Sequence, residues 1–174
     1  QTLESNLENG TSFDKILIDF LLLITAEKVD ICKYARDPYL HQFTNLALQP
    51  FLRLNAHSGR QARTNILEII RFFNQMFLIH PAFLDCAATI LPVDSVLQTT
   101  LLIDDNEFRR GVVGFIANLA TSPTCIVTTS AASKLISECL LSMFTIPVLS
   151  GYAIVIFAGL IRFSPIFATT IKSS

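Results

Sequence analysis

The chain has 174 residues and a formal net charge of −1, so no overall positive field draws it to nucleic acid or to an acidic surface. Apolar residues make up 51% of the sequence. The length suits one compact domain or about three and a half helical repeats. The cysteines show no C-x-x-C pairing, which predicts free thiols in a reducing, intracellular compartment. They are Cys32, Cys86, Cys125 and Cys139.

The N-terminal part begins with a polar, acidic stretch at residues 1–10, which we expect to be a flexible lead-in. Residues 11–14 (TSFD) fit a capping box, in which a hydroxyl and a carboxylate satisfy free backbone amides at a helix start. The helix that should follow is apolar nearly all round over residues 16–24, so it needs burial on more than one side. A short helix and a segment kinked or split at Pro50 are expected within residues 30–54.

The rest of the chain is typical of helices separated by short polar breaks, and it shows no strand or hairpin pattern. A turn is expected at residues 55–59 (NAHSG), and Pro92 suits the first turn of a helix. Acidic residues at 104–107 favour a helix start, because they complement the positive end of the helix dipole. The helices with the clearest bounds are expected at residues 61–78, 107–120, 131–144 and 147–161.

The same arrangement, a helical stretch followed by a break at a proline, recurs along the chain. Pro38, Pro81, Pro123 and Pro165 are spaced 43, 42 and 42 residues apart, each at a break between helical stretches. A period in the low forties is typical of stacked helical units, which bury their apolar faces against their neighbours. Apolar residues stand 11, 8 and 4 positions before the last three prolines, and this spacing places them on one helix face. They are Ile70, Phe73 and Phe77, then Val112, Phe115 and Leu119, then Ile154, Phe157 and Ile161.

Residues 116–123 (IANLATSP) resemble the end of the third helix of an armadillo repeat, an Asn-Leu-Ala step followed by a polar turn. Residues 88–102 and 131–141 resemble the small-residue turn and leucine-rich second helix of the same family. The resemblance covers roughly residues 60–174 and implies an all-α fold, a right-handed α-solenoid of about three and a half armadillo-like repeats of about 42 residues. HEAT repeats and other α-solenoids of similar period are alternative assignments for this sequence. The implied organisation is a single domain at 11–174, with a degenerate unit at 11–58, repeats at about 59–104 and 105–146, and an incomplete repeat at 147–174.

In armadillo proteins the third helix of each unit lines a concave groove. The match to IANLA places Asn118, Gly114 and Arg110 on this groove. A shift by the period adds Glu68, Phe72 and Met76 in the unit before, and Tyr152, Ile156 and Leu160 in the unit after.

The groove asparagine recurs only at Asn118 and the chain has no tryptophan, which gives little support to an Asn and Trp ladder holding an extended peptide. The apolar groove residues favour an amphipathic partner helix or a second copy of the chain instead. Ile156→Asp and Leu160→Asp should then abolish partner binding while helix content stays intact. The alternative is a tight superhelix in which these residues cover one another.

Motifs for catalysis, cofactors or metals are missing from the sequence. His41, His57 and His80 have no Cys or carboxylate at ligand spacing, and no phosphate loop, nucleophile elbow or HExxH motif occurs. We therefore expect no enzymatic activity, no cofactor and no metal. Solvated helix faces explain the basic residues, and contact with an acidic or phosphorylated peptide is the alternative. The basic residues concerned are Arg53, Arg60, Arg63, Arg71, Arg109 and Arg110.

Residues 139–161 carry no charge and are long enough for a membrane span, but Pro147, Ser150 and Gly151 interrupt them. We expect a buried helix there, with membrane insertion as the alternative. Because the chain stops nine residues after Pro165, within a repeat, a third hypothesis is a structural segment of a longer solenoid. The patterns predict an intracellular protein-interaction scaffold that binds a partner helix or peptide, or a second copy, and no nucleic acid.

Overall fold

The computed structural model describes residues 37–79, 81–124 and 130–172, and the regular structure in these ranges is helical, with no strand. The all-α prediction is therefore confirmed for this part of the chain. The N-terminal predictions for residues 1–36 lie outside it, as do Cys125 and His80. The helices are α3 (Asp37–Leu52), α4 (Arg60–Ile79), α5 (Pro81–Ile90), α6 (Val93–Leu102), α7 (Asn106–Leu119), α8 (Ser130–Phe144), α9 (Pro147–Phe163) and α10 (Pro165–Lys172).

Helix ends agree closely with prediction where caps and prolines mark them. The carboxylate of Asp105 caps α7 by accepting a hydrogen bond from the backbone N–H of Phe108 at 3.0 Å. Pro147 opens α9, where its missing N–H costs no helical hydrogen bond. Two details differ from expectation. Pro50 lies in the last turn of α3, which stays one helix, and Pro92 immediately precedes α6 instead of lying in its first turn.

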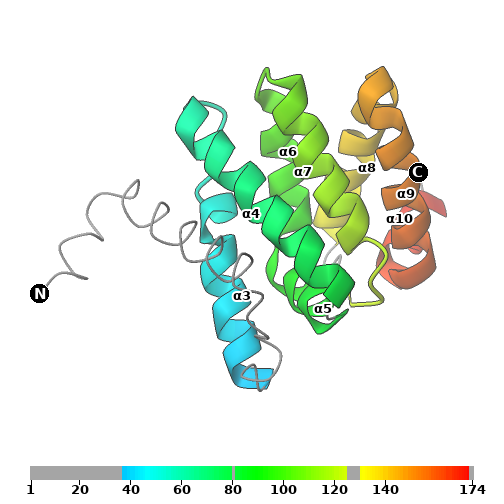
Figure 1. The fold of residues 1–174 in the computed structure, drawn as a ribbon. Coiled ribbons are helices and arrows are strands. Elements are labelled where there is room, and N and C mark those ends of the chain that lie inside the picture. The colour runs from blue at the N-terminus through cyan, green and yellow to red at the C-terminus, as the bar shows by residue number, and fades with distance from the viewer. Residues whose placement is uncertain (1–36, 80, 125–129, 173–174) are drawn as a thin grey trace, which may run out of the picture.

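The helices form two layers (Figure 1). In one layer α4, α7 and α9 lie side by side, with α7 in contact with both neighbours. The other layer contains α3, α5, α6, α8 and α10, in which α3 packs on α5, α6 on α8 and α8 on α10. The chain directions of α4 and α7 are the same, because Arg63 binds Asp105 near their N-terminal ends and Asn74 meets Asn118 near their C-terminal ends.

Phenylalanine rings occupy the centre of the apolar core between the layers. Phe73 and Phe115 are both fully buried, and their ring centroids lie 6.0 Å apart. Phe51 and Phe77 stack on Phe115 with centroids at 5.5 Å and 5.7 Å. Each such pair contributes about 0.5–1.5 kcal/mol beyond the area that it buries. The first two residues of the predicted column eight positions before the prolines, Phe73 and Phe115, therefore form a core contact between α4 and α7.

Helix α9 does not follow the predicted columns. Phe157 is only partly buried and packs on Phe167 of α10 with ring centroids 6.2 Å apart. Ile154, expected to face the core like Ile70 and Val112, is 59% exposed. The prediction is wrong for this helix because α9 turns another face inward, with buried residues again three and four positions apart. These residues are Leu149, Ala153, Ile156 and Leu160.

The outer side of α9 carries exposed apolar side chains. They are Val148, Ile154, Val155 and Ile161. No helix in the described ranges is long and apolar enough by itself to cross a membrane. Taken together α9 and α10 have the length and composition, but the chain bends by 107° between them.

Cys139 lies in α8 and is 6% exposed. Burial raises the pKa of its thiol from 9.0 to about 11, and the carboxylates of Glu138 and Asp94 add to the shift. The folded chain therefore holds this proton more tightly than the unfolded chain. The resulting stabilisation is complete below pH 9 and is lost as the pH rises through about 11.

Between these pH values we expect the free energy of unfolding to fall more steeply in the wild type than in Cys139→Ala. Urea unfolding of both proteins across the interval measures the two slopes. The alanine variant is the control for tyrosines and lysines, which titrate in the same range. Equal slopes would show that the thiol has no such linkage to folding.

Candidate partner-binding site

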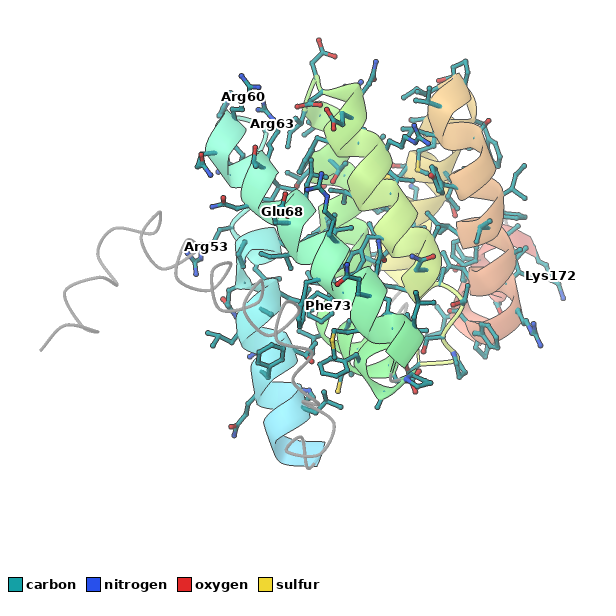
Figure 2. The ribbon with its side chains drawn as sticks, viewed as in Figure 1. Arg53, Arg60, Arg63, Glu68, Phe73 and Lys172 are labelled. Carbon is teal, nitrogen blue, oxygen red and sulfur yellow. The ribbon has the colours of Figure 1, made fainter. Side chains whose placement is uncertain are left out.

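A hollow open to solvent lies across α4, α7 and α9 and encloses about 520 Å³. This volume falls within the range of about 300–1,000 Å³ that is common for ligand sites. Figure 2 shows Glu68 on α4, with Arg60 and Arg63 at the N-terminal end of the same helix. The lining consists of Leu67, Ile70, Arg71 and Asn74 from α4, Glu107, Arg110, Gly111, Gly114, Phe115 and Asn118 from α7, and Tyr152 from α9.

Two glycines of α7 allow the neighbouring helices to come close. A side chain at Gly111 would collide with the side chain of Leu67 on α4. A Cβ atom at Gly114 would lie 3.4 Å from the ring of Tyr152 on α9. Because these positions carry no side chain, the side chains of Leu67 and Tyr152 pack closely against α7 at the hollow.

An amide pair joins α4 to α7 at one end of the hollow. The side-chain nitrogen of Asn118 donates a hydrogen bond to the side-chain oxygen of Asn74 at 3.0 Å. Each amide has one acceptor oxygen and two N–H donors, so the pair retains one free acceptor and several donors after this bond. Asn118 is exposed and Asn74 is partly exposed, so these groups can bond to a ligand.

The cations around α7 divide into structural and free ones. Arg63 binds the carboxylate of Asp105 at 3.0 Å, and Arg109 donates to the carbonyl oxygen of Leu101 at the end of α6 at 3.1 Å. These two arginines therefore connect neighbouring helices. Arg110 is exposed and forms no ion pair with any described residue.

Four of the nine residues predicted for the groove line the hollow. Arg110, Gly114 and Asn118 come from α7, and Tyr152 comes from α9. Their role in binding stays a prediction. Glu68 is partly buried, forms an ion pair with Arg71 on the same helix, and does not line the hollow.

The other four predicted groove residues are core residues. Phe72 and Met76 on α4 are 4% and 6% exposed, and Ile156 and Leu160 on α9 are 0% and 1% exposed. The prediction that they form an apolar groove surface is therefore wrong. These side chains do cover one another and their neighbours, as the tight-packing alternative proposed.

The error arises from the shift of the α7 residues by one fixed period of 42 residues. α4 continues to Ile79, directly before the α5 helix, whereas α7 ends at Leu119 and a turn precedes Pro123. The residue that contacts Asn118 is Asn74, 44 positions away, and not Met76, 42 positions away, although Phe73 and Phe115 keep the separation of 42. Alignment of Asn74 with Asn118 was the sequence signal that could have corrected the match between α4 and α7.

The described residues hold no group of three His, Cys, Asp or Glu side chains that could bind a metal ion. No family model matches the sequence, and neither a curated protein nor a solved structure matches it. The candidate site is therefore defined by its geometry: a hollow across α4, α7 and α9, an amide pair at one end, and Arg110, which has no ion-pair partner among the described residues.

Proposed function

We propose that this chain is a protein-interaction scaffold that binds an extended peptide segment of a partner in the hollow across α4, α7 and α9. The Asn74–Asn118 amide pair at one end of this open hollow carries the proposal. Extended peptides expose one N–H and one C=O group per residue, and side-chain amides bind both.

An extended segment fits this site better than a partner helix. An amphipathic helix of a partner binds with its apolar face in a broad apolar groove. The residues expected to supply that groove, Phe72 and Ile156 among them, are buried. Arg110 and Asn118 are eight positions apart on α7, which corresponds to about 12 Å along the helix axis. Three or four residues of an extended chain cover that distance at about 3.3 Å each.

We further propose that the helices are armadillo-like repeats of a right-handed α-solenoid. Contacts between successive units at a near-constant separation support this. Arg63–Asp105 and Phe73–Phe115 join residues 42 positions apart, and Asn74–Asn118 joins residues 44 positions apart. The two-layer arrangement, in which α7 contacts both α4 and α9, also agrees with stacked units.

Selection of random dodecapeptides displayed on phage against the whole chain tests the binding proposal. We expect enriched peptides whose dissociation constant, measured by fluorescence anisotropy, rises about tenfold in Asn118→Ala, because hydrogen bonds to the ligand backbone are lost. Asn45→Ala is the matched control, since Asn45 is an exposed asparagine on α3. Failure to enrich any peptide, or equal affinity for wild type and Asn118→Ala, would contradict the proposal.

A further inference from the structure

The charges that line the hollow are unbalanced. Arg71 and Arg110 both border it, and Glu107 is the single carboxylate of its lining. Arg71 is engaged with Glu68 on the same helix. Ion pairs at a protein surface contribute only about 0–1 kcal/mol, and Arg71 is exposed, so a ligand carboxylate can replace Glu68 at little cost. Arg110 is exposed and has no ion-pair partner in the described part of the chain.

We propose that the partner segment carries an acidic side chain, whose carboxylate binds Arg110 while the Asn74–Asn118 pair binds the segment's backbone. This inference rests on the proposed function and names the chemistry that the hollow selects. The planar guanidinium presents paired N–H donors that match the two oxygens of a carboxylate. Arg71 adds a second positive charge on the α4 side of the hollow.

The geometry also fixes where the acidic residue lies in the ligand. Arg110 and Asn118 are on one side of α7 and eight positions apart, or about 12 Å along the axis. In an extended segment this distance corresponds to three or four residues. The acidic residue is therefore three or four positions from the residue whose backbone contacts the amide pair.

The test uses the enriched dodecapeptides and the whole chain. We expect an Asp or Glu at a fixed position in these peptides, and a change of that residue to its amide should weaken binding about tenfold. Arg110→Gln should cause a similar loss for the acidic peptide and almost none for its amide form. Arg60→Gln is the matched control, because Arg60 is exposed on α4 outside the hollow and its loss changes the net charge equally.

A charge exchange separates a direct contact from a general electrostatic effect. Arg110→Glu should bind a peptide with Lys at the acidic position more tightly than it binds the original peptide. Enriched peptides without an acidic residue, or equal binding of the acidic and amide forms, would overturn this inference. The proposed function would still stand in that case, provided that Asn118→Ala weakens binding. If no peptide is enriched, the proposed function fails and the inference fails with it.

Discussion

Ile156→Asp is expected to abolish cooperative folding, whereas Ile154→Asp is expected to leave the fold intact. The two residues are two positions apart on α9, yet Ile156 is 0% exposed and Ile154 is 59% exposed. A carboxylate at 156 would be buried without a partner, which costs more than about 4 kcal/mol. A domain is stable by only about 5–15 kcal/mol, so this loss removes a large part of its stability.

Thermal unfolding followed by circular dichroism compares the two variants with the wild type. Ile154→Asp should change the free energy of unfolding by no more than about 0.5 kcal/mol, because its side chain stays in water. The burial of Ile156 and Leu160 overturns the expectation, drawn from the sequence, that aspartate there would disturb only partner binding. A cooperative transition of Ile156→Asp near the wild-type melting temperature would show that the inward face of α9 is assigned wrongly.

Gly159→Ala is expected to destabilise the chain by about 2–3 kcal/mol through overpacking. Gly159 is the point at which α9 meets the end of α7, and an added Cβ would overlap the backbone carbonyl of Ala120. A backbone atom cannot rotate away as a side chain can, so α9 and α7 would have to separate. The melting temperature should fall by about 4–10 °C, which differential scanning calorimetry measures.

Gly151→Ala is the matched control on the same helix, because no atom lies within 4 Å of a Cβ built there. Alanine is the better helix former by about 1 kcal/mol, so this variant should be slightly more stable than the wild type. Gly111→Ala should fall between the two, since it meets only the flexible end of the Leu67 side chain. Equal stability of the alanine variants at 159 and 151 would rule out a close contact between α9 and α7.

Local signals in the sequence accounted for most helix ends. The cap at Asp105 and the prolines at 81, 147 and 165 act within one turn of a helix, so their effect can be predicted without knowledge of the neighbours. Strongly periodic apolar residues likewise predicted the buried face of α7, which includes Val112 and Phe115. The same periodicity failed for α9, which is apolar nearly all round and therefore has no single face marked in its sequence.

The residues of the candidate site likewise divide into those that the sequence predicted and those that it missed. Arg110, Gly114 and Asn118 follow from one short motif on α7, whose inner and outer faces differ clearly in polarity. Arg71 and Asn74 were missed, because the fixed shift of 42 residues leads from Arg110, Gly114 and Asn118 to Glu68, Phe72 and Met76 instead.

The sequence by itself determined that the described part of the chain is helical, where most of its helices end, and which face of α7 is polar, since each depends on residues within one or two turns. Only the tertiary structure decided which asparagine meets Asn118, which face of α9 is buried and that Arg110 forms no ion pair with a described residue. These features depend on how one helix is rotated and shifted against the next. That geometry is set by contacts between residues about 40 positions apart, such as Gly159 with Ala120 and Phe73 with Phe115.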